Sequence, residues 1–520
     1  MRCFMNQDFL KKAELLSPEL IYNTVTAKQV VEVYKTGCSY DSKIIGNVEC
    51  LSSMPLKKGD KVCLDFGQHC VGYISFEART VGNPPDNPAH LKIKFGETIC
   101  EIVEPFENYN GNISSSWLQE EYLFIDVLPD KVNMPRRYAF RYIEFEVLDT
   151  SHQFQLVIEN VSCRTVTSAD MKKITELECN DTELIKIDEV AINTLKDCMQ
   201  EVFEDGPKRD RRLWIGDLRL QALTNYVTFQ NYDLVKRCLY LFAAVPLESG
   251  KTGGCLYIKP SVIVDTAINL FDYSLFFISC LYDYYMATND MQTLKELWEI
   301  AYRQIELAEQ SLDERSVVTD HPDNWWWCFI DWHKDLNKQA AAQAVYIFVS
   351  KQAEQLANIL KDEDKRLYIS RLIEKLEKAA VQYLWDDDNE FFVSGEMRQI
   401  SWASQVWFAI AGIFSKEKTK KLLMSLKEKS PEIRMMTPYM HHCYIEALIA
   451  ADMKSEAEAH IKKYWGGMVK AGADCFWEVY DMENPDLSAY GDRIINSYCH
   501  AWSCTPSYFI RKYFSGKQEG

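Results

Sequence analysis

The sequence predicts a protein of two parts, an antiparallel β-sandwich followed by an (α/α)6 barrel. The spacing of apolar residues changes near Asp181 from every second residue to a helical period of about 3.6. After that point, very short and long connections between helices alternate, which is typical of paired antiparallel helices. A chain of 520 residues also exceeds one ordinary hydrophobic core. We therefore assign residues 1–178 to the sandwich, 179–515 to the barrel and 516–520 to a short tail.

Strand-like segments dominate the first part. This spacing of strands is typical of an antiparallel sandwich. Trp117, with Glu120 and Glu121, could line a sugar groove, but plain packing is the commoner role of an edge-strand tryptophan. Apolar–polar alternation predicts strands at 61–67, 71–77, 90–95, 142–147 and 154–158.

Twelve helices are predicted in the second part, and they pair into six hairpins. Links after even-numbered helices are very short, whereas those after odd-numbered helices are mostly long. A closed ring of hairpins collects the long loops at one end, where binding and catalytic residues are usually found. Closure also places loop 203–216 beside loop 466–493. The helices are expected at 182–202, 217–230, 233–245, 268–287, 291–310, 338–360, 364–385, 400–412, 416–427, 437–451, 453–465 and 494–512.

The composition excludes several classes of function. A net charge of −18 leaves no basic stripe for nucleic acid, and no apolar run approaches the roughly 20 residues of a membrane span. The N-terminus lacks the apolar segment of a signal peptide, and the 17 cysteines form no Cys-x-x-Cys pair. We therefore expect a cytoplasmic protein with reduced thiols, no metal or organic cofactor, and no nucleic-acid or membrane partner. The oligomeric state stays open, a homo-oligomer included.

The first long loop of the barrel carries the densest chemistry. Asp205, Asp210 and Asp217 lie beside Arg209 and near Trp214, with glycines that mark turns. Acids next to cations and an aromatic face suit a site that grips a polyol and moves a proton. A salt-bridged capping loop is the simpler alternative, with Asp217 as the N-cap of the following helix.

A tryptophan-rich segment, 324–332, lies in another long loop. Trp327 and Trp332 offer aromatic faces for the C–H face of a sugar, and Asp331 can accept hydrogen bonds from hydroxyls. The alternative is a hydrophobic anchor that clamps a long loop. We expect one or two of the rings to face a ligand.

Further candidates lie in the second half of the barrel. Glu478 follows two bulky aromatic residues, a setting that perturbs the pKa of a carboxyl group. His500 and Trp502 are expected near the same mouth, although a lone histidine is usually a satisfied core residue. Tyr439 and His442 begin the tenth helix and would at most line the cavity, and adjacent histidines on one helix do not form a metal chelate.

Four motifs, Asp205–Asp217, Phe329–Trp332, Phe476–Glu478 and His500–Ser503, together resemble glycoside hydrolase family 78, the α-L-rhamnosidases. The resemblance covers the barrel and the β-sandwich that precedes it in that family. It implies an inverting hydrolase that removes terminal α-L-rhamnose, or a related deoxy sugar, from small glycosides or oligosaccharides. It also implies Glu478 as the general base, and a sugar surrounded by Asp205, Arg209, Trp214, Asp217, Trp332 and His500.

The general acid is the point at which this chain departs from the family pattern. The family usually has a glutamate in the middle of the first motif, and counting from Asp205 puts Asp210 there. In another form of the motif, Arg211 occupies the place of the glutamate. We take Asp210 as the acid and Glu478 as the base, on opposite faces of one sugar and about 6.5–9.5 Å apart. We also expect no second β-sandwich after the barrel, although many members carry one.

Two alternatives to this hydrolase remain at this stage. A barrel of the same kind could act on a different sugar or cleave by elimination, in which case Tyr439 and His442 would matter more than Glu478. The chain could also be a carbohydrate-binding relative without activity, an alternative kept open by aspartate in place of glutamate at position 210.

Overall fold

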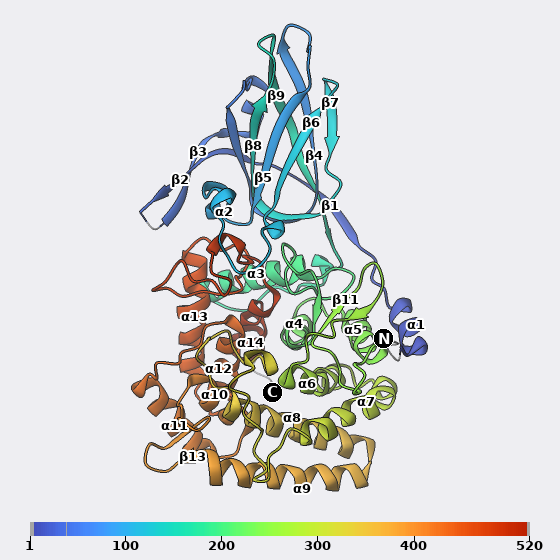
Figure 1. Ribbon diagram of the computed structural model, residues 1–520, viewed down its shortest axis with the longest axis vertical. Coiled ribbons are helices and arrows are strands. Elements are labelled where there is room, and N and C mark those ends of the chain that lie inside the picture. Colours follow the sequence, from blue (N-terminus) through green and yellow to red (C-terminus); the bar gives the residue numbers. More distant parts are fainter. Residues whose placement is uncertain (1–4, 38, 517–520) are drawn as a thin grey trace.

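The computed structural model describes residues 5–37 and 39–516, so four of the five residues of the expected tail, 517–520, lie outside the described part of the chain. A tall β-sheet part stands on a broad helical part (Figure 1). No helix among the described residues is long and apolar enough to cross a membrane.

The described part of the first region holds nine strands in one antiparallel sheet, with the order β1-β9-β4-β8-β5-β6 and with β2, β3 and β7 attached through β4. Buried phenylalanines, among them Phe66, Phe76 and Phe145, form its core. The strands are β1 (Ile21–Thr26), β2 (Gln29–Thr36), β3 (Ser39–Asn47), β4 (Lys61–Gly82), β5 (Ala89–Gly96), β6 (Glu120–Ile125), β7 (Asp130–Asn133), β8 (Tyr138–Asp149) and β9 (Phe154–Thr167).

Strand β4 gives this sheet its shape. Its first residues pair with β2 and β8, and its later residues pair with β8, β9 and β7, so the strands form one continuous sheet rather than two separate ones. The pairing with β8 shifts register between Asp65 and Cys70, where Gly67 has a φ of +70°. Glycine adopts this conformation without the steric cost of a Cβ atom, which permits the bend.

Twelve helices, α3 to α14, follow in the described part of the chain. Helices α4, α6, α8, α10 and α12 contact one another in succession, and α14 contacts α4 and closes this inner ring. The twelve are α3 (Thr182–Cys198), α4 (Ile215–Val227), α5 (Tyr232–Ala244), α6 (Phe271–Thr288), α7 (Met291–Glu309), α8 (Gln339–Leu360), α9 (Glu363–Ala379), α10 (Trp402–Ala411), α11 (Lys416–Lys429), α12 (Pro438–Ala450), α13 (Lys454–Lys470) and α14 (Pro506–Phe509).

Sequence periodicity separates the inner helices from the outer ones. Almost every residue in the first three turns of α6 is buried, whereas α9 buries only a stripe that includes Ile369, Leu372, Ile373 and Leu376. A stripe at this spacing is the pattern of a helix with one face against a core. The (α/α)6 prediction is confirmed, with short links after α4, α6, α8, α10 and α12.

The last helix is much shorter than predicted. A helix was expected over 494–512, but α14 begins at Pro506 and continues only as the π-helical turn η9 (Ile510–Phe514). The preceding residues form the short turns η7 (Arg493–Ile495) and η8 (Ala501–Ser503). Their backbone is used for contacts with other loops, since Ala501 N donates to Asp205 O at 2.7 Å and Ser497 O accepts from Glu478 N at 2.9 Å. Tertiary hydrogen bonds therefore replace helical ones.

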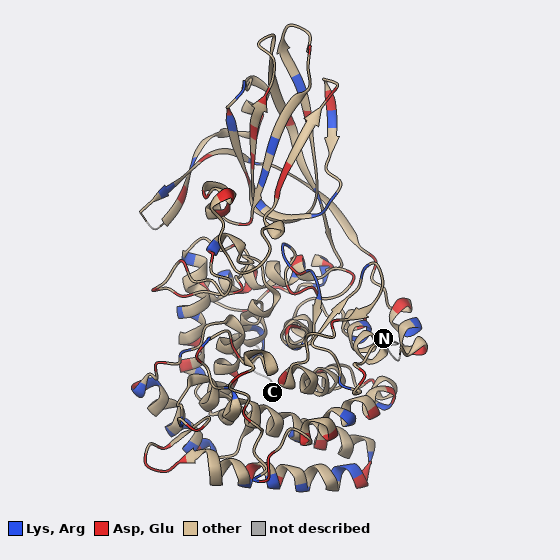
Figure 2. Ribbon diagram, viewed as in Figure 1, with Lys and Arg blue, Asp and Glu red and all other residues tan. Residues whose placement is uncertain are grey.

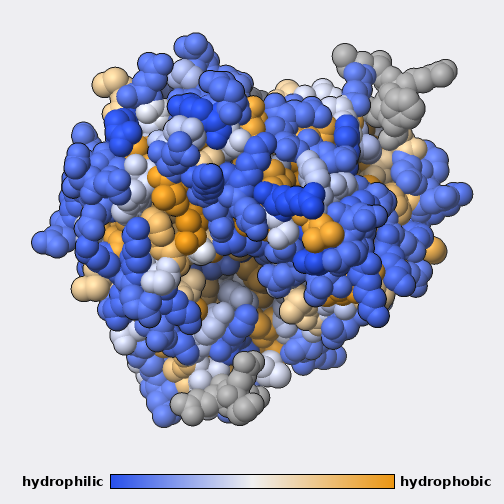
Figure 3. Space-filling model, turned by 90° about the horizontal axis from the view of Figure 1, so that it is seen from below, coloured by the Kyte–Doolittle hydropathy of each residue, from blue (hydrophilic) through white to orange (hydrophobic). Residues whose placement is uncertain are grey.

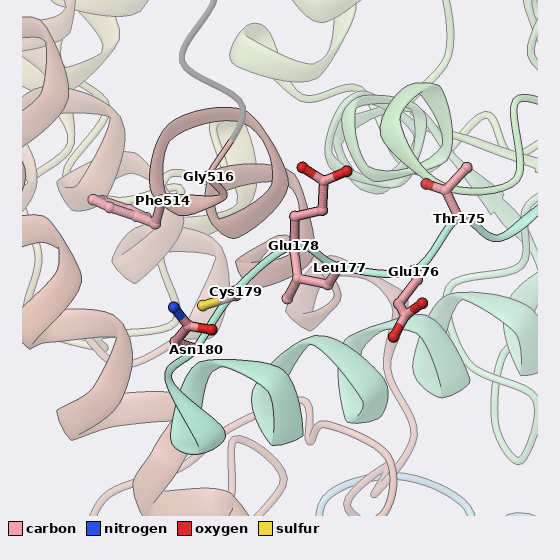
Figure 4. A pocket seen from close by; sticks show the side chains of 8 residues that line it. All are labelled: Thr175, Glu176, Leu177, Glu178, Cys179, Asn180, Phe514 and Gly516. Carbon is pink, nitrogen blue, oxygen red and sulfur yellow. The ribbon is translucent and has the colours of Figure 1, made fainter.

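The end of the described chain closes the ring against its beginning. Arg511 Nη2 bonds Asp188 Oδ2 on α3 at 2.7 Å, and Gly516 N donates to Glu178 O at 2.7 Å. A surface cavity of about 730 Å³ lies between segment 175–180 and the residues Phe514 and Gly516 (Figure 4). None of the predicted site residues lines this cavity.

The first described helix, α1 (Gln7–Leu15), packs on the barrel rather than on the sheet. Its Phe9 ring stacks on Tyr240 of α5 with centroids 5.7 Å apart, and Asn6 N donates to Ala244 O at 2.8 Å. The chain therefore contacts the helical part before it enters the sheet.

Charges of both signs are interspersed along both parts of the fold (Figure 2). Seen from the end opposite the sheet, the surface is mostly hydrophilic, with apolar residues in small separate groups (Figure 3). This distribution agrees with a net charge that is negative but not concentrated in one block.

Candidate active site

The loop between α3 and α4 adopts a tight conformation that the sequence alone did not specify. Asp210 and Arg211 both have positive φ, at 62° and 55°, a region that few residues other than glycine and asparagine-like side chains adopt. Asp205 closes the turn, because its Oδ1 accepts from Arg212 N at 3.0 Å. Helix α4 begins at Ile215, so Asp217 lies in its first turn and is not the predicted N-cap.

The β-sheet part holds this loop in place. Buried Lys208 donates to Glu101 Oε1 of helix α2 (Ile99–Val103) at 2.8 Å and also to Asn496 O. Arg137, beside strand β8, donates to Glu204 Oε2 at 2.6 Å. In both ion pairs, Lys208–Glu101 and Arg137–Glu204, one residue belongs to the sheet part and the other to the helical part. The sheet therefore forms a wall against which the first motif is fixed.

Glu478 is buried and accepts three hydrogen bonds. Tyr490 Oη donates to its Oε1 at 2.6 Å, and Arg209 Nη2 and Ser497 N, the latter at 3.2 Å, donate to Oε2. Burial raises the pKa of Glu478, but Arg209, His500 and Tyr490 outweigh it and lower the pKa to about 2. The carboxylate is therefore ionised at neutral pH.

Arg209 connects the two predicted catalytic carboxylates. Its Nη1 lies 3.7 Å from Asp210 Oδ1, while its Nη2 bonds Glu478. Its guanidinium also lies over the ring of Tyr490, 4.2 Å from the centroid. One guanidinium thus contacts both carboxylates, so Arg209, predicted to surround the sugar, is engaged mainly with Asp210 and Glu478.

His500 lies where the two loops meet. Its Nε2 is 4.0 Å from both Asp205 Oδ2 and Glu478 Oε1, and its Nδ1 is 3.8 Å from Asp217 Oδ1. Burial lowers the pKa of His500 to about 4, so the ring is neutral at pH 7 and Arg209 is the main cation beside Glu478. Burial and the neighbouring carboxylates raise the pKa of both Asp205 and Asp217 well above the usual range.

Several buried polar atoms around this centre have no hydrogen-bond partner among the described residues. Buried polar groups are nearly always paired, so a group of unpaired ones marks a place where a polar ligand or water can bind. A polyol, which presents many donors and acceptors in a small volume, could satisfy several of these atoms at once. They include Asp217 Oδ1, His500 Nδ1, Trp214 Nε1, Trp332 Nε1, Tyr439 Oη and Arg209 Nε.

Aromatic rings form one side of the centre. Trp332 makes an edge-to-face contact with Tyr490 at 5.8 Å between centroids, and Phe329 stacks on Trp502 at 5.6 Å. Trp502 Nε1 donates to Glu478 O at 3.0 Å, which connects these rings to the segment that carries Glu478. Trp214 belongs to the short strand β10 (Leu213–Trp214), which pairs with β11 (Cys255–Tyr257).

Asp331 has a different environment from that expected. Its two oxygens accept from Met436 N at 2.8 Å and from Thr437 N and Oγ1 at 3.1 and 2.7 Å. These donors precede α12, so the carboxylate fixes the start of that helix. Burial raises the pKa of Asp331 to about 6, although these hydrogen bonds act in the other direction.

Two further candidates lie apart from Glu478. Trp327 packs on Phe271, with centroids 5.9 Å apart, and lines a cavity of about 480 Å³ that none of the carboxylates described above lines. His442 is fully buried one turn into α12, with Nε2 3.6 Å from Glu446 Oε2. Tyr439, by contrast, contacts Phe329 and Trp502 beside the centre.

Sequence reasoning missed Tyr490, Ser497 and Lys208. Tyr490 lies in the same long loop as Glu478, so its position in that loop was the available signal. Ser497 acts through its backbone N–H, which leaves no mark in the sequence. Lys208 was part of the first motif, but its partner Glu101 belongs to the sheet part. Among the described residues, a potential metal-binding group is formed by His69, Asp197, Cys475 and Cys499.

Two family models match the chain. The glycosyl hydrolase family 78 alpha-rhamnosidase N-terminal domain matches residues 28–165. The bacterial alpha-L-rhamnosidase 6 hairpin glycosidase domain matches residues 172–514. A search of curated proteins found no match.

Solved structures resemble the chain over nearly its whole length. A rhamnosidase from Klebsiella oxytoca with rhamnose bound is 46% identical with a TM-score of 0.96, and the match covers 99% of this chain and 100% of that one. The family 78 rhamnosidase of Bacillus sp. GL1 shares the fold at 18% identity and a TM-score of 0.73, covering 91% of this chain and 49% of that one. Together, the hairpin-domain match and the Klebsiella structure establish that the chain belongs to glycoside hydrolase family 78, the family of the α-L-rhamnosidases.

Proposed function

We propose that this family 78 glycoside hydrolase removes terminal α-L-rhamnose with inversion, using Asp210 as the general acid and Glu478 as the general base. The observation that carries the proposal is the contact of one guanidinium, that of Arg209, with both carboxylates. A guanidinium between two carboxylates keeps them in one cavity and separates them. Inverting hydrolases need such a gap, because a water molecule must fit beside the base.

The environment of Glu478 suits a base that activates water. Its low pKa keeps it ionised, and Tyr490 and Arg209 fix the orientation of its carboxylate. Oε1 accepts only from Tyr490 among the described residues, so one acceptor position of that oxygen is left for a water molecule. A water bound there would face the sugar from one side.

Asp210 is suited to the role of general acid because a substrate can reach its side chain. Its side chain is 19% exposed, whereas those of Asp217 and Glu478 are almost fully buried. Asp210 has a left-handed backbone conformation, which does not occur within a regular strand or helix, so the chain turns at this residue. Aspartate is shorter than the glutamate usual in the family, so its backbone must lie closer to the glycosidic oxygen. The tight loop from Asp205 to Arg212 could hold the backbone in that position.

The sugar would bind among the unpaired polar atoms. Asp217 Oδ1 and His500 Nδ1 can hydrogen-bond with hydroxyls, and Trp214 Nε1 and Trp332 Nε1 can donate to them. The Klebsiella relative is described with rhamnose bound, which supports rhamnose as the ligand here. Tyr439 and His442 share no hydrogen bond among the described residues, so the lyase alternative gains no support.

We also propose that the protein acts in the cytoplasm on small imported rhamnosides. Each described cysteine is a free thiol, which favours a reducing compartment. The long loops of the barrel and the wall formed by the sheet favour access to chain ends over access to the middle of a polymer.

The test combines product stereochemistry with two variants. ¹H NMR during cleavage of p-nitrophenyl α-L-rhamnoside should show β-L-rhamnose first, followed by mutarotation. Glu478→Gln should lower kcat by about 10²–10⁴, the usual contribution of a general base. His152→Gln, on the surface loop between β8 and β9, is the control and should keep full activity. Retention of configuration, or unchanged turnover by Glu478→Gln, would contradict the mechanism.

A further inference from the structure

Four side chains with metal-binding atoms meet at the boundary between the sheet and the barrel. His69 lies at the bend of β4, Asp197 is near the end of α3, and Cys475 and Cys499 both belong to the connection between α13 and α14. Their ligand atoms all lie within 4.8 Å of one another, and all four side chains are buried. They are far apart in the sequence, so the cluster exists only in the folded chain.

We propose that His69, Asp197, Cys475 and Cys499 bind one structural zinc ion. Thiolate, imidazole and carboxylate are the ligands that zinc takes in proteins, and four of them complete a closed tetrahedral site. Ligands at about 2.0–2.3 Å from zinc lie about 3.3–3.8 Å from one another in a tetrahedron. Asp197 Oδ2 lies 2.7 Å from His69 Nδ1 and 3.8 Å from Cys475 Sγ, so small shifts would admit the ion.

The surroundings of His69 orient it as a metal ligand. Its Nε2 faces Glu97 Oε1 at 3.1 Å, and Glu97 is itself fixed by Tyr498 N at 2.7 Å and Lys208 Nζ at 3.4 Å. A hydrogen bond from Nε2–H to a carboxylate leaves Nδ1 deprotonated and turned toward Asp197. Metal-bound histidines usually have such a carboxylate on the other ring nitrogen.

The charges around the cluster suit an ion bound to two thiolates. Zinc with two thiolates, one carboxylate and neutral imidazole carries a net charge of −1, and Lys196 Nζ lies 3.3 Å from Asp197 Oδ1. Binding would release the protons of Cys475 Sγ and Cys499 Sγ to solvent, so zinc affinity should rise with pH.

Two metal-free arrangements are the rivals. In the first, a protonated His69 bridges Asp197 and Glu97, which explains these three groups but not the convergence of two sulfur atoms on the same point. In the second, Cys499 forms a disulfide with Cys475 or with Cys198, whose Sγ is 3.9 Å away. A disulfide needs about 2.05 Å between the sulfur atoms, so the thiols would have to move together.

The position of the cluster connects it to the centre described above. Cys475 precedes Glu478 by three residues, and Cys499 directly precedes His500. A bound ion would therefore fix the segments that carry Glu478 and His500 to the sheet through His69. The metal site does not depend on the proposed reaction, and its test reads metal content rather than turnover.

Metal analysis of the full chain is the direct experiment. The wild type, expressed with added zinc and freed of any affinity tag, should contain roughly one zinc per chain. Cys475→Ser and Cys499→Ser should lose most of it, and Glu97→Gln should weaken zinc binding by about 10–100-fold. Cys50→Ser, on a half-buried thiol in the sheet part, is the matched control and should retain zinc.

A second measurement covers variants that fail to fold. Wild-type protein stripped by a chelator and reloaded with Co²⁺ should show a thiolate-to-cobalt charge-transfer band, and chelation should lower its Tm. The proposal is overturned if the wild type binds neither metal, if Cys475→Ser binds as much zinc as the wild type, or if peptide mapping finds Cys499 in a disulfide.

Discussion

Two arginine–glutamate pairs with a buried arginine lie in the same barrel, one between loops and one between helices. Arg209 and Glu478 both belong to loops, whereas Arg219 on α4 bonds Glu446 on α12 at 2.8 Å. The pKa of each glutamate is lowered to about 2, because its arginine outweighs the effect of burial. The same ion pair therefore occurs once on helices of the inner ring and once on loops.

The difference between the pairs lies in their neighbours. Beside Glu478 lie a partly exposed Asp210 and unpaired polar atoms of Asp217 and His500. Beside Glu446, whose side chain is 28% exposed, lie Asp283 on α6 and His442 on α12, and polar atoms of both are unpaired as well. A low carboxyl pKa and unpaired polar neighbours thus do not identify a catalytic residue by themselves. What sets Glu478 apart is its place in a long loop beside the aromatic rings of Trp332 and Trp502.

The largest expected effect separates the two pairs by stability. Glu446→Gln leaves the buried guanidinium of Arg219 with only the carboxylate of Asp283, whose Oδ2 is 3.9 Å from Arg219 Nε, and we expect the free energy of unfolding to fall by about 3 kcal/mol. The kcat of the folded variant should match that of the wild type. Chemical denaturation and active-site-normalised turnover measure the two quantities. A large loss of kcat in a fully folded Glu446→Gln protein would show that the comparison is wrong.

Asp210→Asn sharpens the comparison within the loop region. We expect kcat to fall by about 10²–10⁴ on an alkyl rhamnoside, because its leaving group needs a proton. The loss on p-nitrophenyl rhamnoside should be much smaller, because p-nitrophenolate leaves without one. Asp331→Asn is the control, since its carboxylate bonds the start of α12, and any loss should be equal on both substrates. Equal losses for Asp210→Asn would exclude it as the acid.

Tyr490→Phe should have the smallest effect. The variant removes one donor that lowers the pKa of Glu478, so this pKa should rise toward its ordinary value. Because the base must be ionised, the acidic limb of the kcat/KM profile should move to higher pH, and kcat/KM at pH 7 should fall on the order of tenfold. Tyr480→Phe, whose ring packs on Trp477, should leave the profile unchanged. An unshifted limb in Tyr490→Phe would mean that Tyr490 does not act on the base.

Much of the fold could be predicted because its signals are local. The alternation in the sheet and the 3.6-residue period of the helices reflect which face of each element is buried. The last helix was misplaced because residues 493–503 bond distant loops instead of one another. The surroundings of Asp331 could not be predicted for a related reason, since three of the four donors to its carboxylate come from residues more than a hundred positions away.

By itself, the sequence determined the two-part architecture, the hairpin order and the meeting of the loops that carry Asp210 and Glu478. Only the tertiary structure decided which charge faces which. The Arg209–Glu478 pair spans 269 positions, and Lys208 reaches Glu101 across the boundary of the two parts. The physical reason is that the periodicity of buried residues depends on the sequence of a single helix or strand. A hydrogen bond between distant residues depends instead on atomic positions that many elements determine together.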